Sequence, residues 1–147
     1  MLSIRPASRE DEAAVLALVE ELFEPPGSRP PGYGRDRAGV AFRGAMEDPA
    51  ADVLLAVDGG RIVGLASVYV DVHTIRFGRR CWIEDLVVTA AHRGRGIGRR
   101  LLEAATEWAR ARRCTHLGLV SAAARRDAHR FYLANGMAAS QHFTRPV

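Results

Sequence analysis

The sequence predicts a single α/β domain in which one mixed, mostly antiparallel sheet is flanked by helices. Three observations lead to this fold class. The hairpin turn Asp58-Gly59-Gly60 joins two apolar stretches and makes the middle of the chain antiparallel. A glycine-rich turn at residues 93–98 joins another apolar stretch to an amphipathic helix. The length of 147 residues, 48% of them hydrophobic, suits one compact domain over residues 1–147.

The first third of the chain predicts one strand and two helices. Residues 2–5 alternate between apolar and polar side chains, as in a strand. Ser8 and Asp11 have the spacing of a capping box, and apolar side chains then recur at helical intervals as far as Leu22. Pro25-Pro26 ends this helix. Beyond it we expect a loop rich in proline and glycine at residues 27–34 and a second helix at residues 37–47.

The remaining two thirds of the chain predict further strands and two more helices. Each strand is a short apolar run bounded by turn residues, and each helix has apolar side chains three or four residues apart. Gly136 is the expected C-terminal stop of the last helix. The strands are expected at residues 53–57, 61–70, 79–88 and 115–120, with one or two more within residues 138–145. The helices are expected from residue 97 onward and at residues 124–135, and residues 71–78 form a connection.

Composition argues against several classes of protein. No apolar run approaches the roughly 20 residues of a membrane span, and the first residues lack a signal-peptide stretch, so we expect a cytoplasmic protein without a membrane partner. Cys81 and Cys114 have no zinc-type spacing, and no metal is expected. The net charge is +4 and every basic side chain is arginine. That excess suits a polyanionic ligand and equally a solvated surface.

The turn Arg-Gly-Arg-Gly-Ile-Gly at residues 93–98 carries the sharpest functional signal. It opens a helix, whose first N–H groups lack internal partners and form a ready anion site. Its three glycines let the backbone approach a phosphate closely. Four arginines surround the turn, so a pyrophosphate is the expected guest. These residues are Gly94, Gly96 and Gly98, with Arg93, Arg95, Arg99 and Arg100.

Other interpretations of this turn are less well supported. A Walker loop would continue with Gly-Lys-Ser/Thr, which is absent here. A dinucleotide fingerprint would open a βαβ unit, whereas this turn follows antiparallel hairpins. A nucleic-acid-binding arginine-glycine segment would be low in complexity, so no nucleic-acid partner is expected. A plain turn with surface arginines remains open.

The turn resembles the acyl-CoA pyrophosphate loop of the GNAT superfamily of N-acetyltransferases, whose pattern is Gln/Arg-x-x-Gly-x-Gly/Ala. Here Arg93, Gly96 and Gly98 meet that pattern. The likeness covers nearly the whole chain, including residues 83–88 before the loop and residues 128–137 after it. The sequence departs from the family in three places. Arg125 stands where many relatives have asparagine seven residues before Tyr132, Met137 replaces a phenylalanine, and Thr89-Ala90 replaces Asp-Pro.

The resemblance implies an acetyl-CoA-dependent N-acetyltransferase that works by direct attack in a ternary complex. The sheet would splay at residues 79–88 to hold acetyl-CoA. Backbone groups of Leu86, Val87 and Val88 would pair with the pantetheine arm and polarise the thioester carbonyl. The remaining implied coenzyme contacts are Arg93, Gly94, Arg95, Gly96, Ile97, Gly98, Arg99, Arg125 and Tyr132.

Acetyl transfer needs a base, because an alkylammonium with a pKa near 10 must lose a proton, and it benefits from an acid at the leaving thiolate. The resemblance favours Glu84 as base and Tyr132 as acid. Asp85 is adjacent, and a regular strand would send only one of the two carboxylates into the cleft unless a bulge intervenes. Glu84 could instead pair with an arginine, and Tyr132 could be a core residue. A covalent intermediate on Cys81 is disfavoured, since no activating histidine is adjacent.

The acceptor is the open question. The resemblance places the acceptor pocket within residues 20–47, where Glu20, Glu21, Glu24 and Asp36 would suit a cationic amine. A small-molecule amine is expected, with polyamines, aminoglycosides, amino acids, and protein N-termini or lysines all open. Two other functions stay open: a non-catalytic acyl-CoA sensor of the same fold, and a nucleic-acid-associated protein. The sequence also leaves open a homodimer.

Overall fold

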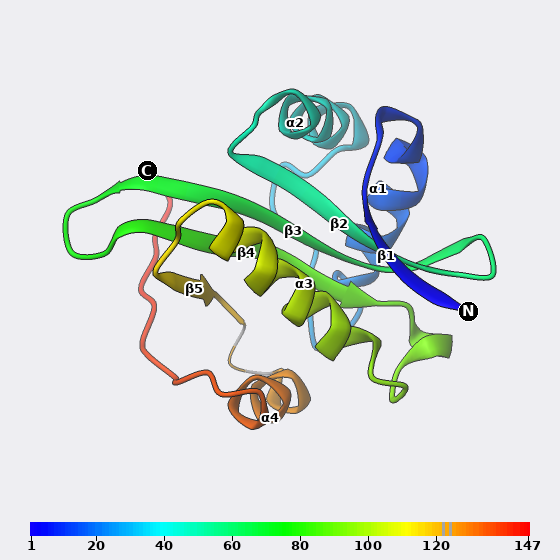
Figure 1. The fold of residues 1–147 in the computed structure, drawn as a ribbon. Coiled ribbons are helices and arrows are strands. Elements are labelled where there is room, and N and C mark those ends of the chain that lie inside the picture. Colours follow the sequence, from blue (N-terminus) through cyan, green and yellow to red (C-terminus); the bar gives the residue numbers. More distant parts are fainter. Residues whose placement is uncertain (122, 124) are drawn as a thin grey trace.

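The fold is one five-stranded sheet in the order β1-β2-β3-β4-β5, seen in a computed structural model that describes residues 1–121, 123 and 125–147 (Figure 1). The first four strands pair antiparallel, and β5 pairs parallel with β4. The predicted fold class is therefore confirmed. The strands are β1 (Leu2–Pro6), β2 (Ala51–Asp58), β3 (Arg61–Thr74), β4 (Gly78–Val88) and β5 (His116–Leu119). The helices are α1 (Glu12–Glu21), α2 (Arg35–Glu47), α3 (Ile97–Ala111) and α4 (Arg126–Ala134), with short 3-10 turns at Arg9–Asp11 and Ala90–His92.

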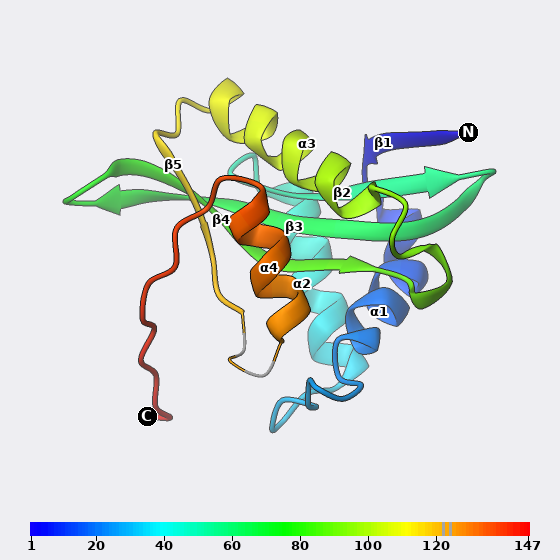
Figure 2. The ribbon, with the colours of Figure 1, turned by 90° about the horizontal axis from the view of Figure 1, so that it is seen from below.

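Helices cover both faces of the sheet (Figures 1 and 2). On one face Val15 and Phe42, from α1 and α2, pack against Leu55 and its neighbours in the sheet. On the other face Leu101, from α3, packs against Ala56. Adjacent residues of β2 thus point into different cores, which explains why this strand reads as a continuous apolar run. No helix among the described residues has the length and apolar character needed to cross a lipid bilayer.

The predicted capping box forms at the entry to α1. The backbone N–H of Ser8 donates to Asp11 Oδ2 at 2.8 Å. Two nitrogens of Arg5 donate to the same carboxylate, at 2.9 and 3.0 Å, and thereby connect β1 to the turn at Arg9–Asp11. The Arg5 hydrogen bond is the largest cause that lowers the pKa of Asp11 to about 2. A short-range sequence signal therefore also fixes how the first strand meets the first helix.

Two predictions about the sheet were wrong. The third strand continues four residues beyond Val70, to Thr74, because β4 pairs with it across the expected connection at residues 71–78. The expected strands within residues 138–145 do not form, although the structure describes this whole segment. Its largest apolar side chain, Phe143, is 87% exposed. Burial of apolar side chains therefore does not offset the entropy lost on ordering the segment.

The last helix differs at its start and agrees at its end. It was expected from Ala124, a residue that lies outside the described part of the chain, and the observed helix begins at Arg126. Gly136 follows the helix with φ +85°, a left-handed conformation that suits glycine, so it is the C-terminal stop as predicted.

The Asp11 carboxylate predicts a pH-dependent stability. Asp11→Asn should lower the free energy of unfolding at pH 7 by up to about 1 kcal/mol, because the amide oxygen can still accept from Ser8 N–H but no longer carries the negative charge that pairs with Arg5. Because the pKa of Asp11 falls from 3.8 to about 2 on folding, its stabilisation is present above pH 4 and is lost as the pH falls through 2. The difference between the wild-type and variant melting temperatures should shrink over that window. Glu10→Gln, at the exposed neighbouring carboxylate, is the control, and an equal effect there would contradict the assignment.

Candidate functional site

The site begins where β4 and β5 part. Their ladder pairs residues 80–83 with residues 116–119 and ends at Ile83 and Leu119. Strand β4 nevertheless continues to Val88, held on its other side by β3 as far as the Gly64–Val88 pair. Beyond Ile83 the edge of β4 that faced β5 has no β5 residue opposite it. The expected splay is therefore present, and it falls in the second half of β4.

The glycine-rich turn follows directly from this free edge. Thr89 N–H donates to Val63 O at 2.9 Å, which anchors the chain before it enters the turn. Gly94 and Gly96 have φ of +77° and +78°, and Gly96 is the N-cap of the 15-residue helix α3. Glycine is favoured at both positions because other residues rarely adopt this conformation. The start of a long helix and its free N–H groups thus lie beside the end of β4.

A cavity of about 600 Å³ lies against this turn. Its wall combines the end of β4, the turn, the start of α3, the residues after α1, and α4. Eleven of the residues implied by the resemblance line it: Leu86, Val87, Val88, Arg93, Gly94, Gly96, Ile97, Gly98, Arg99, Arg125 and Tyr132. Two do not: Arg95, which is exposed in the turn, and Glu84.

Other residues of the wall were missed from the sequence. They are Leu22, Pro26, His92, Arg126, Asp127, Ala128 and Phe131. In the sequence Leu22 is the last residue of an apolar helical stripe, and its neighbours carry no signal of a cavity. The Phe131 ring lies 3.4 Å from where a Cβ at Gly98 would stand, so this glycine lets α3 and α4 approach each other.

Tyr132 lies in the wall, half-buried, with its ring edge-on to that of Phe131 at 5.4 Å. Burial raises the pKa of the Tyr132 phenol, and the positive charge of Arg125 opposes that effect. The phenol is therefore protonated at neutral pH, which is the state that can donate a proton.

Glu84 is the extra residue of a β-bulge. Ser67 lies opposite Asp85 while the next residue of β3, Val68, lies opposite Ile83, so Glu84 has no residue of its own to face. Asp85 N–H donates to Ser67 Oγ at 2.9 Å, and burial, followed by the charge of Glu84, raises the pKa of Asp85. Glu84 is exposed and makes no ion pair within the described chain. It lies two residues before Leu86 of the cavity wall.

Of the acidic residues expected at the acceptor pocket, Glu20 is already hydrogen-bonded within the protein. Glu20 accepts hydrogen bonds from two nitrogens of Arg35, at 2.7 and 2.9 Å, and from the Tyr33 hydroxyl at 2.7 Å. These contacts, Arg35 foremost, lower the pKa of Glu20. Glu20 thus holds the loop between α1 and α2 in place, and its charge is already balanced.

The structure also bears on two alternative chemistries. Cys81 is fully buried, and burial raises the pKa of its thiol to about 12, so it is not a thiolate nucleophile at neutral pH. Within the residues that the structure describes, no three His, Cys, Asp or Glu side chains gather as metal ligands.

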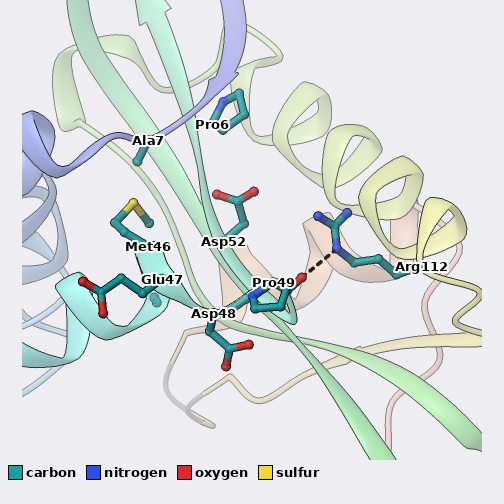
Figure 3. Close-up of a pocket in the computed structure, with 10 residues that line it drawn as sticks. Pro6, Ala7, Met46, Glu47, Asp48, Pro49, Asp52 and Arg112 are labelled. Atoms are coloured by element: carbon teal, nitrogen blue, oxygen red, sulfur yellow. Dashed lines mark hydrogen bonds between the residues drawn. The ribbon is translucent and has the colours of Figure 1, made fainter.

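A second cavity, of about 370 Å³, lies away from the turn (Figure 3). Asp48, Asp52 and Arg112 are among its lining residues. The Arg112 guanidinium stacks 3.8 Å from the centre of the Trp108 ring, and its Nε donates to Pro49 O at 3.4 Å. This cavity contains neither a helix N-terminus nor a tyrosine, so it offers no comparable arrangement for thioester chemistry.

Comparisons with known proteins agree with this geometry. Residues 15–137 match the model of the acetyltransferase (GNAT) family. Over 140 residues the chain is 36% identical to the aminoalkylphosphonate N-acetyltransferase of Salmonella typhimurium, covering 95% of this chain and 86% of that protein. It is 32% identical over 114 residues to the glucosamine 6-phosphate N-acetyltransferase of Trypanosoma brucei brucei, covering 77% and 75% of the two. An aminoglycoside N-acetyltransferase solved in complex with CoA shares the fold, with a TM-score of 0.86 at 15% identity over 100% of this chain and 94% of that one.

The turn predicts the effect of a charged side chain at Gly96. Gly96→Glu should weaken acetyl-CoA binding, because a carboxylate at this position would repel the pyrophosphate. We expect the affinity to fall at least tenfold, which is roughly the effect of losing one charge-assisted hydrogen bond. Calorimetric titration with acetyl-CoA measures this. Gly59→Glu is the matched control, since Gly59 also has a positive φ, at +57°, but lies in the β2–β3 hairpin. Unchanged affinity in a folded Gly96→Glu variant would contradict the phosphate-binding role.

Proposed function

The chain belongs to the GNAT acetyltransferase family and is an acetyl-CoA-dependent N-acetyltransferase, and we propose that it acetylates the primary amine of a small acceptor by direct attack. One observation carries this proposal. The cavity places a helix N-terminus, a free strand edge and the Tyr132 phenol in one wall. These are the groups needed for the three parts of an acyl-CoA: its pyrophosphate, its pantetheine arm and its thioester sulfur.

The proposed binding of acetyl-CoA follows from this wall. The pyrophosphate would accept hydrogen bonds from backbone N–H groups at residues 94–98, supported by Arg93 and Arg99. The pantetheine amides would pair with the edge of β4 at residues 86–88 that β5 leaves, where they would compete with Arg93 Nε for the Val88 carbonyl. A backbone N–H on that edge would stabilise the oxyanion formed when the carbonyl is attacked.

The proposed reaction needs two proton transfers. The amine nitrogen attacks the carbonyl carbon, a C–N bond forms, and the C–S bond then breaks. Glu84 accepts the amine proton through water, since it lies beside the cavity rather than in its wall. Tyr132 gives a proton to the departing sulfur and regains one from solvent. The products are an amide and coenzyme A.

The names of the relatives suggest the acceptor class. Aminoalkylphosphonates and glucosamine 6-phosphate are both small molecules that carry an amine and a phosphorus oxyanion. We therefore propose a small primary amine bearing a phosphonate or phosphate group. Thiol release from acetyl-CoA over a panel of amines tests this, with glucosamine 6-phosphate compared with glucosamine as a matched pair. Saturable release that favours the phosphorylated member supports the proposal, and preference for peptide N-termini would overturn it. No release with any amine would favour the acyl-CoA sensor.

If Glu84 is the base, its removal should slow acetyl transfer without weakening coenzyme binding. Glu84→Gln should lower kcat/KM for the amine by about 10²-fold and flatten its rise with pH, because the base is removed. Coenzyme affinity should hardly change, since Glu84 does not line the cavity. Asp85→Asn is the companion variant. A larger loss there would move the role of base to Asp85.

If Tyr132 is the acid, removing its hydroxyl should slow catalysis without destabilising the protein. Tyr132→Phe should reduce kcat by roughly 10- to 10³-fold, since a thiolate leaves with help from an acid but does not strictly require one. The ring that packs on Phe131 stays, so the melting temperature and acetyl-CoA affinity should change little. A destabilised variant with nearly normal kcat would instead show that the hydroxyl is a structural group.

A further inference from the structure

Arg125 joins two parts of the cavity wall that are 103 residues apart in the sequence. It precedes α4, and its carbonyl accepts a hydrogen bond from His129 N–H in the first turn, which fixes its backbone. Its side chain leaves the helix, and Nη2 donates to the carbonyl of Leu22, the C-cap of α1. Figure 2 shows the start of α4 beside the segment that follows α1. The last carbonyls of a helix lack internal partners and carry partial negative charge, so a guanidinium is a favourable partner there.

Gly27 closes the same contact from the loop side. A Cβ at this position would stand 2.3 Å from Arg125 Nη2 and 1.9 Å from Leu22 O. Both distances are far below van der Waals contact, and the carbonyl is backbone that cannot move aside cheaply. The loop backbone therefore lies directly against the guanidinium, and only glycine fits. Leu22, Gly27 and Arg125 together form what we term the clasp.

Two of the three clasp residues, Leu22 and Arg125, lie in the wall of the cavity that Tyr132 also lines. Leu22, Pro26 and Arg125 all line the cavity, so the contact closes the wall between α1 and α4. Arg125 also lies near enough to Tyr132 for its charge to act on the phenol. If the clasp opened, the loop would leave this wall and water would enter beside Tyr132.

We propose that Arg125 is a positioning residue that holds the loop after α1 against α4 and thereby shapes the acceptor side of the cavity. The inference rests on the proposed function for its kinetic consequences and on geometry alone for the docking of the loop. It differs from the coenzyme-binding role that the resemblance implied for Arg125. Coenzyme binding would depend on the guanidinium itself, whereas the clasp depends equally on Gly27.

The kinetic test compares the two sides of the clasp. Arg125→Met should raise KM for the amine about tenfold or more, the usual effect of losing a charged hydrogen bond, and leave KM for acetyl-CoA within about threefold. Arg125→Lys should restore part of the loss. Gly27→Ala should give the same pattern with the guanidinium retained, and the double variant should be no worse than the poorer single one, since both break one contact. Arg130→Met removes an exposed arginine from the same helix and is the control.

Hydrogen exchange tests the docking without any catalysis. The backbone N–H groups of residues 22–24, 27 and 28 should exchange faster in Arg125→Met and Gly27→Ala than in the wild-type protein or Arg130→Met. Unchanged exchange would overturn the clasp, as would an equal rise in KM for both substrates or effects that multiply in the double variant. A wild-type protein that acetylates no amine would instead refute the proposed function, and hydrogen exchange would still decide the clasp.

Discussion

The end of the β4–β5 ladder is the constraint on which the site depends. Strand β3 pairs with β4 on both sides of the Glu84 bulge and as far as Val88, so β4 continues after β5 ends at Leu119. The chain after β4 must then reverse to reach α3, and the positive φ at Gly94 and Gly96 makes that reversal tight. The strand edge that β5 leaves, where Arg93 Nε already donates to Val88 O at 3.0 Å, and the helix N-terminus therefore come from one short stretch of chain. Backbone N–H groups of a strand edge and of a helix N-terminus therefore lie close together.

The helices complete this arrangement by filling the opening. Helix α4 lines the cavity together with the part of β4 that β5 does not pair with. Gly98 lets the Phe131 ring pack against the start of α3. That packing places Tyr132, the next residue, in the cavity wall. On the opposite face, Glu12 and Arg43 join α1 to α2 at 2.6 Å, and Glu20 and Arg35 fix the loop between them. The Glu20–Arg35 pair thus joins the two ends of the loop, and the clasp holds its first residues against Arg125.

Charges of opposite sign lie at different points along the chain that forms β4 and the turn after it. Arg93 of the turn and Arg99 of α3 line the cavity, as the proposed binding of the pyrophosphate requires. The bulge leaves Glu84 exposed beside Asp85, whose pKa is raised by burial and by its neighbour. Several arginines are already paired with carboxylates, as Arg35 is with Glu20, Arg43 with Glu12, and Arg99 of the cavity wall with Glu103. The overall excess of arginine therefore says less about ligands than the few guanidinium groups that line the cavity.

Much of the fold and part of the site could be predicted from the sequence because the signals are local. The Asp58-Gly59-Gly60 hairpin, the Ser8–Asp11 capping box and the stop at Gly136 each depend on a few adjacent residues. The extension of β3 to Thr74 depends on its partner strand, and the failure of residues 138–145 to form strands depends on what they could bury. The contact between Arg125 and Leu22 is purely tertiary, and no spacing in the sequence marks it.

A crystal structure of the protein with acetyl-CoA tests the central claim most directly, because every proposed role follows from where the coenzyme lies. We expect the pyrophosphate against residues 94–98, the pantetheine arm along residues 86–88, and the thioester sulfur within about 3–4 Å of the Tyr132 hydroxyl. Coenzyme bound at another surface, or a sulfur remote from Tyr132, would contradict it.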